Sequence, residues 1–99
     1  TDTIAIAAKL NRPMDVAVTP DGQQLLIADT YNHRVRAVRL DAGRIRRFAG
    51  TGSPLFDGEG LDAADTALEL PGGLTVHDDG TLFLSDTGHH IVWRTPLRF

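Results

Sequence analysis

The sequence contains no cysteine and no long apolar run. Without cysteine the chain has no disulfide, no thiolate nucleophile and no zinc site of the cysteine type. The longest apolar stretches, such as Ile4–Ala8 and Leu25–Ala28, are far too short to cross a membrane, and no segment has the features of a signal peptide. Because no Met precedes Thr1, we expect that a leader or tag was removed or that the chain was cut from a longer one.

An excess of positive charge is also absent. The formal net charge is −3, which argues against a general nucleic-acid binder. With 41% hydrophobic and 23% charged residues, the composition is that of an ordinary globular chain, so we do not expect disorder. A length of 99 residues is enough for one small domain.

Two copies of one unit fill most of the chain. The segment from Pro13 to Gly22 matches the segment from Pro71 to Gly80 at an offset of 58 residues. Leu25–Thr30 then matches Leu82–Thr87 at an offset of 57, because one residue has been lost in the turn. The correspondence continues in two further pairs, Asn32 with His89 and His33 with His90.

Each unit has the pattern of an antiparallel meander. Met14, Val16 and Val18 alternate with small or polar residues, which is the period of a half-buried strand. Pro20-Asp21-Gly22 has hairpin-turn chemistry, and the apolar run Leu25–Ala28 predicts a strand covered on both faces. The expected strands lie at 14–18, 25–28, 34–40 and 45–49 in the first unit and near 73–77, 82–86 and 90–94 in the second.

The second unit lacks a fourth strand, and one strand is left over at the start of the chain. Thr3–Ala8 is predicted to be this orphan strand, since its Ile6-Ala7-Ala8 resembles Phe48-Ala49-Gly50 at the end of the first unit. The glycine-rich and proline-containing connector is expected to be a loop, with a helical turn or two over 61–68. The expected organisation is an outer strand over 1–9, a complete unit over 10–50, the connector over 51–69 and three strands over 70–99.

The stretches LNRPMDVAVTPDGQQLLIADTYNHRVRAVRL and LPGGLTVHDDGTLFLSDTGHHIVWR resemble NHL repeats. The motif that names this family is Asn32-His33-Arg34-Val35 in the first unit and the more degenerate His89-His90-Ile91-Val92 in the second. The resemblance implies an all-β fold, a β-propeller with blades of four antiparallel strands around a central channel, usually six-bladed. His89 stands where the family usually has Asn, and no Arg follows His90.

The resemblance implies two blades per chain, and two blades cannot close a ring. Leaving the two outer blade faces in water would forfeit on the order of 10 kcal/mol, which rivals the stability of a small domain. The chain is therefore expected to be a fragment of a longer propeller or to assemble with copies of itself. The permuted strand order favours assembly, because the orphan strand of one copy can complete the three-stranded blade of the next. Three copies would form a six-bladed homotrimer.

The recurring polar set at the end of the second strand resembles a site. It comprises Asp29, Asn32 and His33 in the first unit, and its counterparts are Asp86, His89 and His90. Because the set occupies the same place in both units and catalysis rarely needs copies, we interpret these residues as turn staples that bond backbone N–H groups. Thr30 and Thr87 fit the same role.

Metal ligands are weakly indicated, and no cofactor is predicted. His77 ends an inner strand, so symmetric copies could gather several His77 side chains at the channel rim. Asp57 and Glu59 lie in an acidic glycine loop that lacks the complete calcium-loop pattern. Peptidylglycine amidating lyase, an enzyme on this scaffold, has zinc histidines after the Pro that opens the inner strand. Met14 and Gly72 occupy those positions here, which argues against lyase chemistry.

Three functions remain open at this stage. The leading hypothesis is a non-enzymatic propeller scaffold or binding module, an engineered or excised two-blade unit included. The alternative is a ligand-binding, metal-binding or enzymatic propeller whose site forms at the assembled channel from Asp15, Thr75 and His77. The third is RNA binding through arginines on the two outer strands of the first unit: Arg34, Arg36, Arg39, Arg44, Arg46 and Arg47. Residues 1–49 carry +3 and residues 50–99 carry −6, which favours attraction between unlike units instead.

Overall fold

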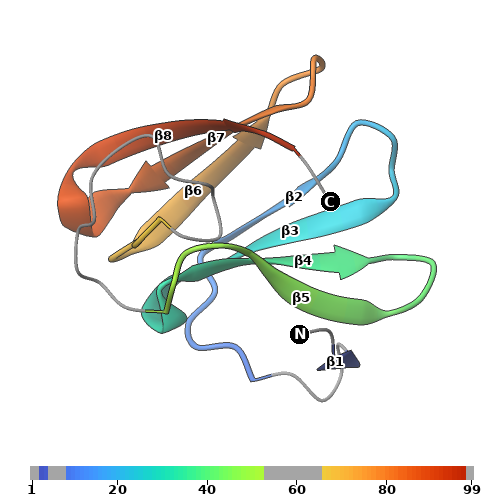
Figure 1. The fold of residues 1–99 in the computed structure, drawn as a ribbon, viewed down its shortest axis with the longest axis horizontal. Helices are drawn as coiled ribbons and strands as arrows, with labels where there is room; N and C mark the ends of the chain where they lie inside the picture. The colour runs from blue at the N-terminus through green and yellow to red at the C-terminus, as the bar shows by residue number, and fades with distance from the viewer. Residues whose placement is uncertain (1–2, 5–8, 53–65, 98–99) are drawn as a thin grey trace.

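The computed structural model describes residues 3–4, 9–52 and 66–97, which form two antiparallel sheets (Figure 1). The first sheet has the spatial order β1-β5-β4-β3-β2, and the second has the order β6-β7-β8. The strands of the first sheet are β1 (Thr3–Ile4), β2 (Asp15–Val18), β3 (Gln24–Asp29), β4 (Arg34–Arg39) and β5 (Arg44–Ala49). The second sheet contains β6 (Pro71–Val76), β7 (Thr81–Asp86) and β8 (Ile91–Pro96). The all-β class is confirmed, and so are a four-strand meander β2–β5 and a three-strand meander β6–β8.

The strands fall where the apolar alternation predicts them, with ends displaced by at most two residues. The hairpin turns between β2 and β3 and between β6 and β7 close on Gly22 at φ +73° and Gly80 at φ +87°. Only glycine adopts this backbone at low cost, which is why an Asp-Gly pair marks both turns. Two 3-10 turns, η2 (Thr30–Asn32) and η4 (Thr87–His89), join β3 to β4 and β7 to β8.

The N-terminal strand lies in an unexpected place. Thr3 pairs with Ile45 and Ile4 pairs with Arg44, so β1 extends the outer edge of its own first sheet. The segment is therefore not an unpaired strand in the single chain, because the backbone groups on the free side of β5 offer it a ladder. Residues 5–8 of the expected strand and residues 53–65 of the connector, with most of its expected helical turn, lie outside the described residues.

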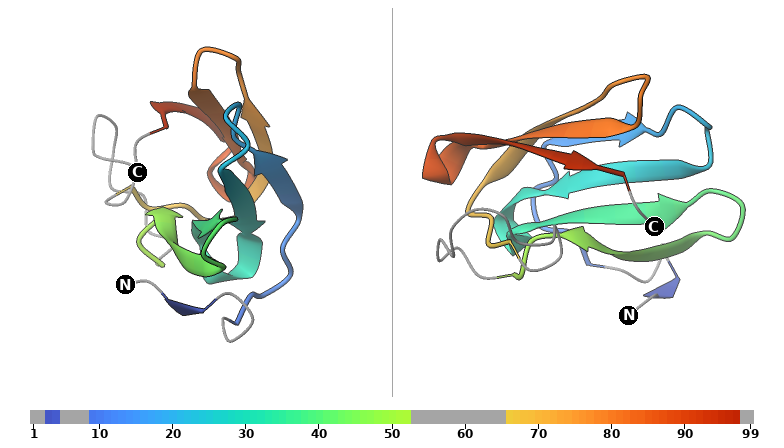
Figure 2. Two further views of the ribbon diagram at one scale, coloured as in Figure 1. Left: turned by 90° about the vertical axis from the view of Figure 1, so that its right-hand side faces the viewer. Right: turned by 45° about the horizontal axis from the view of Figure 1, so that its top comes forward.

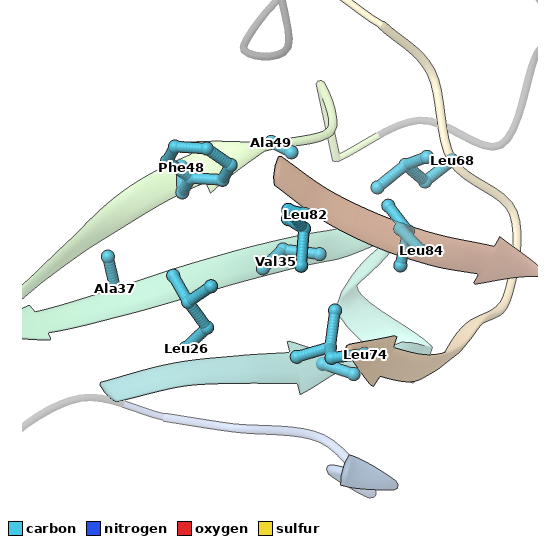
Figure 3. Close-up of a cluster of buried hydrophobic side chains, with 10 residues drawn as sticks. Leu26, Val35, Ala37, Phe48, Ala49, Leu68, Leu74, Leu82 and Leu84 are labelled. Carbon is cyan, nitrogen blue, oxygen red and sulfur yellow. The ribbon is translucent and has the colours of Figure 1, made fainter. Parts of the chain in front are cut away.

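The main core lies between the two sheets, which face each other (Figure 2). The inner strands of the two meanders meet, since β6 contacts both β2 and β3. Figure 3 shows side chains from both sheets pointing into this space. The buried apolar residues of this core are Leu26, Ala28, Val35, Ala37, Phe48, Ala49, Leu68, Leu74, Leu82 and Leu84.

The opposite face of the first sheet carries a second, smaller apolar cluster. Ile27, Val38 and Ile45 are buried there, with Leu25 packed against them. The run Leu25–Ala28 therefore contributes buried side chains to both faces of β3, as a continuous apolar run predicts. On the same face, Val16 and Val18 stay 56% and 54% exposed. Within the described ranges, no helix is long and apolar enough to cross a membrane.

Candidate functional site

Asp29, the last residue of β3, is 0% exposed and accepts hydrogen bonds from three elements. Its Oδ1 accepts from the backbone N–H of Asn11 at 2.8 Å, and its Oδ2 accepts from Asn32 Nδ2 at 2.9 Å. The guanidinium of Arg36 on β4 donates to the same Oδ2 at 3.2 Å. One buried carboxylate thus ties the segment entering β2 to the turn that follows β3, and buried carboxylates persist only when paired in this way.

Asp86 repeats the arrangement in the second sheet and is also 0% exposed. Its Oδ1 accepts from the backbone N–H groups of Glu69 and Leu70, both at 3.1 Å. His89 takes the place of Asn32, with Nδ1 lying 2.7 Å from Asp86 Oδ2. The His for Asn replacement therefore preserves the side-chain partner of the carboxylate, because an imidazole N–H can donate as an amide does.

The histidines that follow the two 3-10 turns have the same backbone. His33 and His90 both lie at φ 58° and ψ 41°, in the left-handed region where histidine is more frequent than most residues. Each donates its backbone N–H to the threonine that opens its turn, His33 to Thr30 and His90 to Thr87, at 3.2 Å in both cases. Equal geometry at the two positions supports the division of the chain into two equivalent units.

Thr30 and His33 join the first unit to the second. The hydroxyl of Thr30 donates to the carbonyl of Pro71 at 2.7 Å, and Nδ1 of His33 donates to the carbonyl of Glu69. Asp15 adds a third such bond, since its Oδ2 accepts from the backbone N–H of Leu74 at 2.8 Å. The sequence pattern does not predict these hydrogen bonds between the two units, because the recurrence of a motif does not reveal which unit holds the acceptor or donor that the motif contacts.

The three channel-facing candidates do not form one cluster. Asp15 and Thr75 line the same shallow hollow of about 240 Å³, on whose floor Gly73 contributes no side chain. Both carboxylate oxygens of Asp15 already accept backbone N–H groups, from Val16 at 2.9 Å and from Leu74. His77 lies beyond the end of β6, exposed, with its Nδ1 3.2 Å from Asp79 Oδ1.

Metal ligation finds no support in the described ranges 3–4, 9–52 and 66–97, where no group of three or more histidines and carboxylates could hold an ion. Asp57 and Glu59 lie outside the described residues. The candidate calcium loop and the candidate gathering of His77 side chains therefore stay predictions from the sequence.

Two exposed turn carboxylates have a lowered pKa. The hydroxyl of Thr19 donates to Asp21 at 2.6 Å and holds the pKa of that carboxyl below its ordinary value, and the backbone N–H of Gln23 acts in the same direction. Hydrogen bonds from Thr81 lower the pKa of Asp79. Because both pKa values are lowered by folding, the contribution of these turns is present at neutral pH and is lost as the pH falls through the folded-state pKa.

The arginines of the first sheet gather on β4 and β5, where Arg36 pairs with Arg47 and Arg39 with Arg44 across the ladder. Several of them have local partners. Arg36 binds the buried Asp29, Arg39 lies 3.3 Å from Asp41, and Arg46 lies 3.5 Å from the side-chain oxygen of Gln24. The two carboxylate partners neutralise part of the positive charge that would otherwise attract a nucleic acid.

Comparison with known proteins finds the repeat family in the first part of the chain. Residues 10–37 match the NHL repeat model. The chain carries an NHL repeat. The resemblance drawn from the Asp29 to His33 motif is thereby confirmed, and the matched range ends within β4.

Curated relatives extend the likeness to most of the chain. NHL repeat-containing protein 2 of Bos taurus is 31% identical over 90% of this chain, and the Homo sapiens protein of the same name is 30% identical over 90%. Protein SUPPRESSOR OF QUENCHING 1, chloroplastic, of Arabidopsis thaliana is 30% identical over 92%. The match covers only 12% of the first two relatives and 8% of the third.

Proposed function

We propose that the chain is a non-enzymatic scaffold and binding module of β-propeller type, a two-blade unit whose copies complete a ring. Blade one is residues 10–50, and blade two is residues 70–99, whose three strands are β6, β7 and β8. Three copies give six blades. The observation that carries the proposal is that the two sheets pack against each other through one face each, which leaves Val16 and Val18 exposed on one outer face and Phe83 and Val92 exposed on the other.

The repeat equivalence says what each bare face is built to meet. The face of blade one that packs on blade two includes Leu26 and Val35, and the equivalent residues of blade two are Phe83 and Val92. Phe83 and Val92 are 38% and 68% exposed. The face of blade two that packs on blade one includes Leu74 and Val76, whose counterparts are the half-exposed Val16 and Val18.

Each bare face is thus the counterpart of a face that is already covered inside the chain. A second copy that sets its Val16 and Val18 against Phe83 and Val92 would repeat the packing between β2, β3 and β6. Contacts of this kind are head-to-tail, and head-to-tail contacts generate a ring when the rotation closes.

Ring closure improves the energetics of this contact. Burying a Val or Phe side chain stabilises by about 1.5–3 kcal/mol, and association costs about 4–15 kcal/mol in lost freedom. A closed ring of three copies makes three interfaces for two association steps, whereas an open chain of three makes only two. Closure therefore adds one whole interface without a further loss of translational freedom.

Among the described residues no strand pairs with the outer edge of β8, which supports the same arrangement because a bare edge recruits another strand. In the ring, the N-terminal segment would leave β5 and add to β8 of the neighbouring copy, giving blade two its fourth strand. Among the described residues, Thr3 and Ile4 pair with β5 in the single chain, and the ring would exchange this ladder for one with β8.

The alternative is a small-molecule site at the channel hollow lined by Asp15 and Thr75. The scaffold interpretation is favoured because Asp15 has a complete structural role: its carboxylate bridges the backbones of the two blades. RNA binding through the arginines is less favoured still, given the net charge of −3.

Placing a charge on the bare face tests the proposal. We expect Val92→Asp to leave the chain folded and to shift it toward the mass of a single copy, because Val92 is 68% exposed in one chain and would be buried in the ring. Sedimentation equilibrium measures the shift. Leu40→Asp is the matched control, since Leu40 is 50% exposed beyond the end of β4, and its mass should equal that of the unmodified chain. Equal masses for all three proteins would contradict the proposal.

A further inference from the structure

Inside the chain, blade one is fastened to blade two by a pair of side-chain donors on η2 and the residue after it. Thr30, 4% exposed, donates its hydroxyl to the carbonyl of Pro71, and His33 donates Nδ1–H to the carbonyl of Glu69. Both acceptors lie in the segment that leads into β6, the inner strand of blade two. The pair therefore links the end of β3 to the segment that enters the next blade.

The same pair of donors exists in blade two. Thr87 and His90 are the counterparts of Thr30 and His33 by sequence, and His90 has the same φ and ψ as His33. Both residues are exposed. Within the described part of the chain, neither the Thr87 hydroxyl nor the His90 ring has a hydrogen-bond partner. The backbone geometry of the first pair is thus reproduced at a place where no described residue accepts a hydrogen bond from these side chains.

The matching acceptors belong to the first unit. Pro13 and Asn11 are the counterparts of Pro71 and Glu69, at the entrance to β2. The carbonyl of Asn11 accepts the backbone N–H of Tyr31 at 3.0 Å, and a carbonyl oxygen can accept a second hydrogen bond. Donor half and acceptor half therefore border the two bare faces, one at each end of the two-blade unit.

We infer that Thr87 and His90 form the donor half of a latch between copies, in which the Thr87 hydroxyl and His90 Nδ1–H of one copy donate to the carbonyls of Pro13 and Asn11 of the next. The partner is a second copy of this chain, because the chain holds both halves and repeats, between its own blades, the contact that they would form. The inference rests on the proposed ring and names the residues that set its register. The apolar faces alone would tolerate sliding, whereas two directed hydrogen bonds do not.

Thr87→Val and His90→Asn test the latch. Thr87→Val removes the hydroxyl and keeps the shape, and Asn tolerates the left-handed backbone while falling short of the imidazole. We expect each variant to raise the concentration at which half of the assembly dissociates by about tenfold, as one lost hydrogen bond at an interface does. Circular dichroism of dilute, dissociated chains should show the same melting temperature as the unmodified protein.

Thr30→Val is the matched control, because the bond that it removes lies within the chain. It should lower the melting temperature of the dilute chain. Thr87→Val should leave that melting temperature unchanged. If the unmodified chain assembles and both variants are half dissociated at the same concentration as the unmodified chain, the latch is wrong and the ring stands. If the unmodified chain is a monomer at every concentration, the ring itself is wrong and the latch falls with it.

Discussion

Asp29→Ala should lower the free energy of unfolding by about 3 kcal/mol, the usual cost of removing one partner from a buried ion pair with further hydrogen bonds. The carboxylate is 0% exposed and serves the Asn11 backbone, the Asn32 amide and Arg36. The substitution leaves all three donors without their acceptor, and the Arg36 side chain is itself only 12% exposed. Urea denaturation at equal chain concentration measures the loss.

Asp41→Ala is the matched control for this change. Asp41 pairs with Arg39 at 3.3 Å, but the Asp41 side chain is 59% exposed, and exposed pairs contribute about 1 kcal/mol or less. Asp29→Asn should fall between the two, because the amide keeps one acceptor oxygen and loses the charge. If Asp29→Ala unfolds at the same urea concentration as Asp41→Ala, the staple interpretation fails and a functional role for the motif must be reopened.

Deleting residues 1–8 should abolish ring closure and leave β-structure in place. The truncated chain cannot supply a fourth strand to blade two, so the free edge of β8 stays bare in every copy. Bare edges recruit other chains, and we expect heterogeneous oligomers or aggregates in place of one species. Gel filtration beside the full chain shows the difference, and far-UV circular dichroism reports whether the strands remain.

Removal of residues 1–2 alone controls for a shortened terminus, since it keeps Thr3 and Ile4 and the expected strand up to Ala8. That variant should elute with the unmodified chain. In a competing account, the N-terminal segment only covers the edge of β5 in its own chain. That account predicts one unchanged peak for both deletions, and this result would refute strand exchange between copies.

The strand pattern could be predicted from sequence because each signal is local. Val16 and Val18 alternate with smaller or polar neighbours, and Asp-Gly turns mark the hairpins. The position of β1 could not be predicted in this way. Thr3 and Ile4 pair with Ile45 and Arg44, about forty residues away, and pairing at that separation depends on which edge is free in three dimensions. The backbone N–H and C=O groups of an edge strand can pair with any of several free strand edges, and the strand's own side chains do not determine which edge it joins.

The staple interpretation rests on a signal of a different kind. A carboxylate that recurs at the same place in two units, as Asp29 and Asp86 do, indicates a role that every unit needs. The partners of Thr30 and His33 were not predictable, since a hydrogen bond between blades leaves no local periodicity. The available signal was the recurrence of Thr30 at Thr87 and of Pro13 at Pro71, which becomes meaningful once the two sheets are seen to touch.

The mass of the chain in solution tests the central claim most directly. Sedimentation velocity with light scattering, over a wide range of concentrations, distinguishes a closed ring from an open series of aggregates, because only a ring stops at one size. The account predicts a single folded species of three times the 10.7 kDa mass of one chain. A folded species of 10.7 kDa at all concentrations would contradict it, because no copies would then join into a ring.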